Sequence, residues 1–210
     1  GDRAYLVTFQ RIDPLFVIDL SEPSAPRVLG ELKIPGVSEY LHPYDENTII
    51  GVGRSTEEIK DRVMFKGIKI SLFDVTDVAN PVEKAKIEIG DQGTYSDALY
   101  DHKAFLFSKE KNLLVLPMTV YENSGNFYGS PVFNGAYAFD ITSDGISVRG
   151  RVTHTTETEI WNNQIRRSLY IENVLYTISN SLIKANSLSD LSEINSIKLP
   201  QSFYGGPIVY

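Results

Sequence analysis

The chain has 210 residues, of which 42% are apolar and 22% are charged, a composition typical of a globular protein with one large or two small domains. Its formal net charge of -7 argues against a nucleic-acid partner, since the sequence offers no basic phosphate-binding face. It has no cysteine, which excludes disulfides and cysteine-based zinc sites, and no apolar run reaches the ~18 residues that a membrane-spanning helix needs.

Along the chain, the clearest pattern is a unit of two strands joined by a turn, which occurs four times. Its first strand, best seen at Ile68–Val75, is apolar on both sides and is therefore predicted to be covered on both faces. The second strand alternates, with Lys84 and Lys86 on one face, which indicates a half-exposed strand near a sheet edge. The pairs are predicted at Leu15–Leu20 and Arg27–Ile34, Ile68–Val75 and Val82–Ile89, Ala136–Ile141 and Ile146–Val152, and Leu182–Asn186 and Glu193–Leu199.

Two further strands precede each complete unit, and a single strand, Ala4–Phe9, precedes the first. They are predicted at Val37–Leu41 and Thr48–Val52, Tyr95–Leu99 and Leu113–Leu116, and Ile165–Leu169 and Val174–Ser179. Repeats of about 40–50 residues with four strands each are typical of β-propeller blades. We therefore predict an all-β fold, with one β-propeller domain over residues 1–210 and about four blades. The predicted parts are a partial blade at 1–35, blades at 36–90, 91–152 and 153–199, and a tail or closing strand at 200–210.

The first predicted blade lacks its innermost strand, and Gly1 opens in mid-pattern, so we expect a C-terminal fragment of a larger propeller. An open strand edge recruits whatever strand can pair with it. Two outcomes stay open: the tail Tyr204–Tyr210 returns and closes the ring, or two copies meet as a homodimer through their open blade edges.

The polar residues that recur at the turns, and the few histidines, each allow a functional and a structural interpretation. The recurring acidic residues Asp19, Asp74 and Asp140 suggest calcium sites, but each stands nearly alone, so we interpret them, with Asn186 at the matching turn of the last repeat, as turn formers. The three histidines, His42, His102 and His154, lack the spacing of metal ligands and are interpreted as structural. Asp97 and Asp101 lie near His102. The sequence therefore predicts no catalytic residue, no metal site and no cofactor.

Three segments interrupt the blade pattern and are predicted to be long loops on one side of the ring: Arg54–Lys66, Pro117–Asn134 and Thr153–Gln164. Within the first, Ser55–Phe65 is expected to be a loop, with a helical turn at most. Long loops on a rigid scaffold usually carry function, and aromatic residues and arginine dominate interface hot spots. The predicted binding residues are Arg54, Tyr121, Phe127, Tyr128 and Trp161. The alternative is that the aromatic side chains only pack the loops onto the blades.

Three charged residues occupy the same position of the three predicted innermost strands: Glu39, Asp97 and Arg167. They are candidates to line a central channel and bind a small polar ligand. Equally, they could form a belt of salt bridges that holds the blades together.

Several strings, taken together, resemble one protein family: DRAYLVTF, DPLFVIDLS, VLGELKIPG, YLHPYDEN, YSDALYDHKAFLF, GAYAFD, RRSLYIENVLYTIS and IKAN. The set is similar to secreted prokaryotic proteins with a C-terminal β-propeller distantly related to WD-repeat proteins, and it extends to about Leu199. The resemblance implies a secreted or extracytoplasmic propeller whose earlier blades precede Gly1. It implies no catalytic residue.

Two functions from different classes follow. The first is a non-enzymatic extracytoplasmic binding module that presents its long loops to a protein or glycan partner. The second is a hydrolase or lyase acting on a carbohydrate or peptide at the channel mouth. Propellers host both classes, so the fold does not decide between them, but the lack of any catalytic motif favours the binding module.

Overall fold

The computed structural model describes residues 2–8, 13–59, 62–123, 129–155 and 163–200. These residues form strands and two short 3-10 turns. Among them, no helix is long and apolar enough to cross a membrane. The strands are β1 (Arg3–Val7), β2 (Asp13–Asp19), β3 (Arg27–Ile34), β4 (Val37–Pro43), β5 (Thr48–Ile59), β6 (Arg62–Asp74), β7 (Val82–Ile89), β8 (Leu106–Ser108), β9 (Leu113–Glu122), β10 (Ser130–Thr142), β11 (Gly145–Val152), β12 (Arg167–Ile171), β13 (Val174–Ile178), β14 (Leu182–Ser187) and β15 (Glu193–Lys198); the turns are η1 (Asp97–Leu99) and η2 (His102–Ala104).

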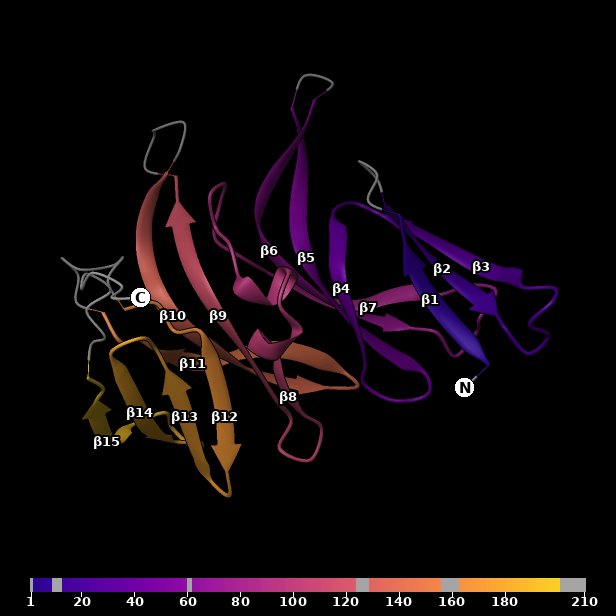
Figure 1. Cartoon of the computed structure of the whole chain (residues 1–210). Helices are drawn as coiled ribbons and strands as arrows, with labels where there is room; N and C mark the ends of the chain where they lie inside the picture. The colour runs from indigo at the N-terminus through magenta and orange to yellow at the C-terminus, as the bar shows by residue number, and fades with distance from the viewer. Residues whose placement is uncertain (1, 9–12, 60–61, 124–128, 156–162, 201–210) are drawn as a thin grey trace, which may run out of the picture.

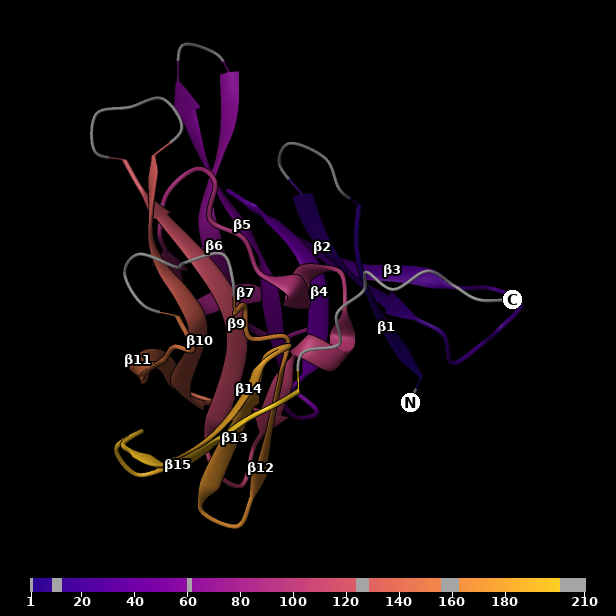
Figure 2. The same cartoon turned by 60° about the vertical axis from the view of Figure 1, so that its left-hand side comes forward.

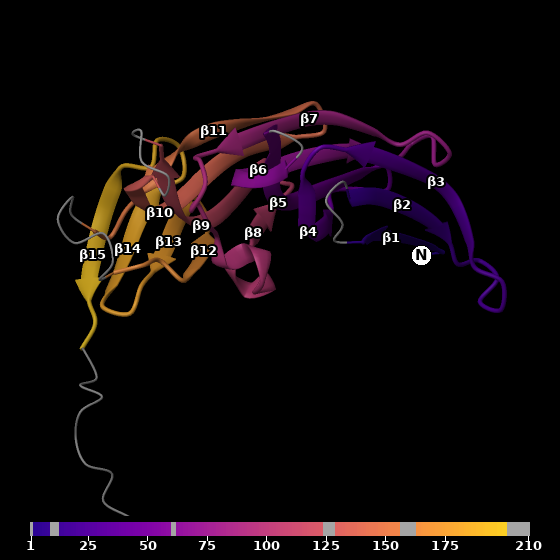
Figure 3. The same ribbon diagram turned by 90° about the horizontal axis from the view of Figure 1, so that it is seen from above.

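The strands form four antiparallel sheets, each from strands that are consecutive in the chain (Figure 1). The first sheet has three strands (β1–β3), and the second (β4–β7), third (β8–β11) and fourth (β12–β15) have four each. Seen from above, the sheets follow one another around an open arc, with β1, β4, β8 and β12 on its concave side (Figure 3). The predicted all-β fold with propeller-type blades is confirmed.

Apolar side chains bury the faces where neighbouring sheets meet, and these layers form the core. Leu15, Val17 and Phe73 pack between the first two sheets; Ile50, Ile70 and Phe139 between the second and third; Leu113, Val115 and Leu175 between the third and fourth. The central strands of the second and third sheets are apolar on both sides because neighbouring sheets cover both faces of each.

The predicted loop at Ser55–Phe65 is wrong, because this segment continues the strand pair β5–β6. The ladder passes a bulge between Arg54 and Thr56 and runs out to the pair Ile59 and Arg62. The predicted loop at Pro117–Asn134 is also largely strand, since β9 and β10 pair as far as Glu122 and Ser130. Both hairpins rise from the same side of the molecule, as Figures 1 and 2 show.

The predicted innermost strand Tyr95–Leu99 is also wrong. Tyr95 makes a single bridge to Thr119, and the chain then enters η1 and η2 before β8 pairs with β9. Side-chain oxygens cap both turns: Ser96 Oγ accepts the Ala98 N–H at 3.2 Å, and Asp101 Oδ1 accepts the Lys103 N–H at 2.9 Å. These caps satisfy backbone donors locally and so compete with a strand ladder.

The interpretation of the recurring turn residues holds for two of them. Asp19 and Asp74 each accept a backbone N–H two residues on, from Ser21 and Thr76, both at 2.9 Å. Asp140 instead accepts from the guanidinium of Arg149, with the closest contact at 2.8 Å. The Asn186 side chain donates from Nδ2 to the Leu191 carbonyl at 2.8 Å.

Candidate functional site

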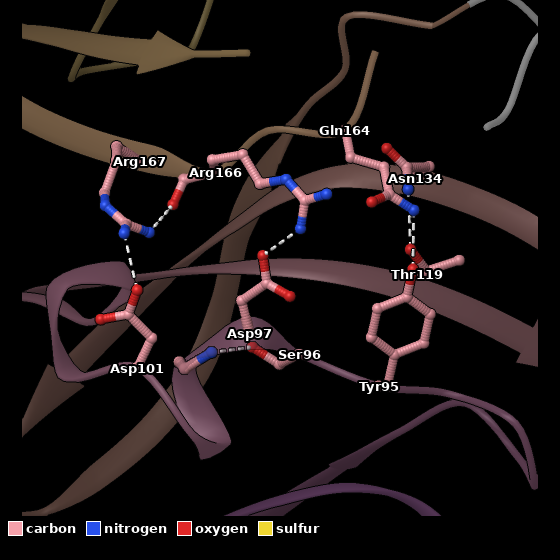
Figure 4. Close-up of polar contacts among 10 residues, drawn as sticks. Tyr95, Ser96, Asp97, Asp101, Thr119, Asn134, Gln164, Arg166 and Arg167 are labelled. Carbon is pink, nitrogen blue, oxygen red and sulfur yellow. Dashed lines mark hydrogen bonds and ion pairs between the residues drawn. The ribbon is translucent and has the colours of Figure 1, made fainter. Parts of the chain in front are cut away.

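The concave side of the arc is irregular where the third sheet meets the fourth. Here η1 and η2 replace most of an innermost strand, and the chain that enters β12 lies beside them (Figure 4). We name this place the inner-edge site and define it by five residues: Asp97, Tyr100, Asp101, Arg166 and Arg167. They line an open cleft of about 340 Å³.

Two ion pairs cross from the turns of the third sheet to the start of the fourth sheet. Arg166 Nη1 lies 2.9 Å from Asp97 Oδ2, and Arg167 Nη2 lies 2.6 Å from Asp101 Oδ2 (Figure 4). Ile165, which directly precedes the two arginines, is almost fully buried in the core between these sheets and so fixes the position of this part of the chain. Both pairs are partly exposed to solvent, so they fix the positions of the four side chains but add little to the free energy of unfolding.

The carboxyl group of Asp101 is held in its ionised form. The Lys103 backbone N–H has the largest effect and lowers its pKa; burial opposes this shift, and Arg167 lowers the pKa further. A carboxylate that stays ionised at neutral pH accepts hydrogen bonds and does not donate a proton.

Tyr100 is the most exposed part of the site. It follows η1 and is 76% exposed, and its hydroxyl lies 3.4 Å from Nη2 of Arg54. A polar layer lies nearby: Gln164 donates to the Tyr95 hydroxyl at 2.7 Å, and Asn134 donates to Thr119 Oγ1 at 2.7 Å (Figure 4). The inner-edge site thus combines an exposed aromatic ring with charged groups whose partners are already fixed.

The three residues predicted to line a channel each form an ion pair, but each with a different partner. Glu39 lies in β4 and binds Arg54 of the same sheet, with Arg54 Nε donating to Oε1 at 3.0 Å. Asp97 lies in a 3-10 turn and not in an innermost strand, and it binds Arg166. Two of the three pairs join neighbouring sheets, which is the geometry of the belt interpretation.

The predicted loop residues fall partly outside the described part of the chain: Phe127, Tyr128 and Trp161 lie there. Arg54 lies in β5, where its guanidinium also stacks over the Phe65 ring at 4.6 Å. Tyr121 lies in β9, and burial together with the nearby Tyr95 raises the pKa of its hydroxyl. Neither residue stands on a loop.

The sequence interpretation missed Tyr100, Arg166 and the turn geometry. One signal for them was present: Pro117 stands in the second strand of the third sheet, beyond the point where β8 stops pairing with β9. Proline cannot donate a ladder hydrogen bond and belongs on a strand whose neighbour is absent. Within the described residues, no three histidine or acidic side chains gather closely enough to hold a metal ion.

The comparisons with known proteins concern the fold and the family. The model of one family, the Beta propeller domain, matches residues 1–191. An uncharacterized protein of Methanocaldococcus jannaschii is 37% identical over 181 residues, which cover 85% of this chain and 24% of that protein. An uncharacterized protein of Archaeoglobus fulgidus is 44% identical over 117 residues, which cover 56% of this chain and 17% of that protein.

The chain therefore spans about a quarter or less of the length of these curated relatives. Among solved structures, a Glu150Gln mutant of the Synechocystis apocarotenoid oxygenase has a TM-score of 0.42 and 12% identity, covering 94% of this chain and 46% of that one. At this distance the likeness carries no argument about function.

Proposed function

We propose that this chain, which belongs to the Beta propeller domain family, is a non-enzymatic binding module whose ligand, a glycan, binds at the inner-edge site. The carrying observation is the exposed Tyr100 ring beside two Arg–Asp pairs at an open cleft. The whole protein's partners belong to this same proposal.

The chemistry of the site matches a neutral sugar. Each Arg–Asp pair has no net charge, so the lining does not select for a strongly charged ligand. The paired groups keep further N–H donors and oxygen lone pairs, and a sugar hydroxyl can use both because it donates and accepts. The Tyr100 ring offers an apolar face for the C–H side of the sugar, with a polar hydroxyl at its rim.

The same geometry disfavours the hydrolase alternative. A glycoside hydrolase needs one carboxylic acid whose pKa is raised, so that it can donate a proton to the leaving group. At the inner-edge site both carboxylates bind arginine, and the pKa of Asp101 is lowered. Such carboxylates suit hydrogen-bond acceptance.

The test is a glycan screen followed by calorimetric titration of the best ligand against the wild type and Tyr100→Ala. We expect the variant to bind about tenfold more weakly or worse, since truncating an aromatic anchor costs more than ~1 kcal/mol. Its stability should change by less than ~0.5 kcal/mol, because the side chain is on the surface. A matched control is Val82→Ala, which removes an exposed apolar side chain from β7 on the convex side (Figure 3).

Three results would overturn the proposal. Equal glycan affinity of Tyr100→Ala and the wild type would remove the inner-edge site, and release of reducing ends from a bound glycan would make the protein an enzyme. A screen that finds only a protein partner would replace the glycan as ligand.

The proposal extends to location: the protein works in a secreted or extracytoplasmic setting. Its support is the resemblance of the repeat strings to secreted prokaryotic propeller proteins distantly related to WD-repeat proteins. Fractionation of the source cells with an antibody against the chain tests it, and recovery of the full-length protein in the cytoplasm alone would contradict it.

A further inference from the structure

A small pocket adjoins the inner-edge site, where the third sheet meets the chain that enters the fourth. We name it the inner pocket and define it by its polar lining residues, Tyr95, Asp97, Thr119, Asn134 and Gln164 (Figure 4). Its volume is about 10 Å³, which is room for one water-sized group. Asp97 lines both this pocket and the cleft of the inner-edge site, so the two spaces are neighbours.

The inner pocket arises from the break in the repeat. Tyr95 and Thr119 exchange two backbone hydrogen bonds, each 3.0 Å long, and the chain then leaves β9 and enters η1. Among the described residues, no strand pairs with β9 on this side between Val115 and Thr119. Pro117, midway between them, has no N–H to offer a neighbouring strand. Side chains of the third sheet and Gln164 therefore surround the space that an inner strand would fill.

One polar atom of this lining lacks a partner. The side chain of Asn134 is in a residue only 3% exposed, and its Nδ2 donates to Thr119 Oγ1 at 2.7 Å. Its amide oxygen, Oδ1, is buried and has no hydrogen-bond partner among the described residues. A buried acceptor costs free energy unless a donor reaches it. The inner pocket thus presents a buried acceptor that needs a donor.

Two hydroxyl groups complement this acceptor. The Tyr95 hydroxyl accepts an N–H of Gln164 at 2.7 Å, and the Thr119 hydroxyl accepts that of Asn134. Each hydroxyl still carries its own O–H, which can donate to an occupant of the pocket. The occupant must therefore donate to Asn134 and accept from a hydroxyl, within the space of one water. A hydroxyl group does all of this, whereas a carboxylate cannot donate and an ammonium group cannot accept.

We infer that the inner pocket is a subsite for one hydroxyl group of the glycan, namely the exocyclic hydroxymethyl group of a hexose. The inference rests on the function proposed above. A sugar ring is too large for this pocket, but a hydroxymethyl group projects beyond its ring. The ring stays in the cleft beside Tyr100, and the hydroxyl reaches past Asp97 to Asn134. In the free protein we expect one water in this place, and the hydroxyl takes over its hydrogen bonds.

The inner pocket would make the hydroxymethyl group a selective feature of the ligand. A 6-deoxy sugar carries a methyl group there, which can neither donate to Asn134 nor replace the hydrogen bonds of the water. Sites that bind a hydroxyl reject analogues without it, because their buried polar groups are left unpaired. We therefore expect a hexose to bind about tenfold or more tightly than its 6-deoxy counterpart.

The test is calorimetric titration of the chain with the methyl glycosides of glucose, galactose and mannose, each beside its 6-deoxy counterpart. The wild type should prefer the hexose in at least one pair. Asn134→Leu, which is similar in size and apolar, should bind both members of that pair about equally. The matched control is Asn186→Leu, because Asn186 is also buried with an unpartnered Oδ1 but does not line the inner pocket. This control should keep the preference of the wild type.

A second variant decides the matter if circular dichroism shows that Asn134→Leu does not fold. Tyr95→Phe keeps the aromatic ring and removes only the hydroxyl at the pocket. It should lower the preference for the hexose by about threefold, the scale of one hydrogen bond. An unchanged preference in Tyr95→Phe would then overturn the inference.

The outcomes separate this inference from the proposed function. If the wild type binds these sugars without preference within any pair, the hydroxyl does not enter the pocket, and the glycan proposal stands without it. The same follows if Asn134→Leu keeps the preference, or if Asn186→Leu loses it equally. If the wild type binds none of the glycosides at millimolar concentration, the glycan proposal and the subsite fail together.

Discussion

A buried histidine makes the stability of the protein depend on mildly acidic pH. His154 is 8% exposed and lies at the end of the third sheet, against the fourth. Its Nδ1 is 2.9 Å from the Ser179 hydroxyl, and its Nε2 is 2.8 Å from the Thr177 hydroxyl. The Ser179 hydroxyl lies 3.2 Å from the Leu182 carbonyl, to which it can donate, so Nδ1–H is the group that donates to Ser179. This arrangement fits a neutral imidazole.

The size of the effect follows from the pKa. Burial, and to a smaller extent the nearby Lys184, lower the pKa of His154 from 6.5 to about 4, while Glu193 opposes the shift. The unfolded chain binds a proton near pH 6.5, so stability begins to fall there as the pH is lowered, and the loss levels off near pH 4. One pKa unit is worth about 1.4 kcal/mol, which gives about 3 kcal/mol in total and about 2 kcal/mol between pH 7.5 and pH 5.

The assay is urea unfolding of the wild type and of His154→Gln at about pH 7.5 and about pH 5. Glutamine is neutral and can still donate and accept hydrogen bonds at this position. The variant therefore loses the titrating ring, while all carboxyl groups of the protein stay the same. We expect the wild type to lose about 2 kcal/mol more than the variant between the two conditions. Equal losses in both proteins, or a His154 ring that titrates near 6.5 in NMR spectra of the folded protein, would refute the reasoning.

Two further predictions concern buried polar and close-packed positions. Lys69 is buried and pairs with Glu83 at 2.7 Å, so Lys69→Met should lower the free energy of unfolding by about 3 kcal/mol, the scale for leaving one partner of a buried pair alone. The double variant with Glu83→Gln should lose less, and an equal loss would show that the pair is not the cause. A Cβ on Gly53 would overlap the Val37 carbonyl oxygen, whereas one on Gly145 would meet nothing within 4 Å. Gly53→Ala should therefore cost about 1–3 kcal/mol in a thermal melt, and Gly145→Ala less than ~0.5 kcal/mol; similar costs for both would contradict the close approach.

The sequence predicted the central strands well because burial leaves a simple mark there. Ile68, Ile70 and Leu72 are fully buried along one side of β6, and Phe73 is buried on the other. A strand covered on both faces must be apolar on both, so its segment is recognisable without any alignment. The same reasoning identifies β10 and β9.

The extended hairpin β5–β6 was not recognisable in this way, and the reason is physical. Beyond the bulge at Arg54, the two strands leave the stack of sheets and both of their faces reach solvent. Charged residues are then tolerated, and Glu57 and Lys66 form an exposed pair at 3.5 Å. Without a buried face, the alternation that marks a strand is lost, and a charged segment resembles a loop.

The inner-edge site could be predicted in its residue types but not in its arrangement. The repeat pattern placed Asp97 and Arg167 at equivalent positions of inner strands, whereas Asp97 in fact lies in a turn and binds Arg166. The capping side chains Ser96 and Asp101 were the local signals against a strand, because their short polar groups bind the backbone of the following residues. A prediction that assigns the same strands to every repeat misses such local signals when they occur in one repeat only.

The break in the repeat is what makes a site possible on this face. In a regular inner strand, neighbouring side chains alternate between the two faces of the sheet, and each face is covered by the next blade. The turns η1 and η2 instead bring Asp97 and Asp101 to one side, where the consecutive Arg166 and Arg167 can each reach a carboxylate. Tyr100, between the two acids, then has no sheet neighbour to cover it and remains exposed. The regular strands around it carry the stacking energy, so this short segment is free to vary in sequence.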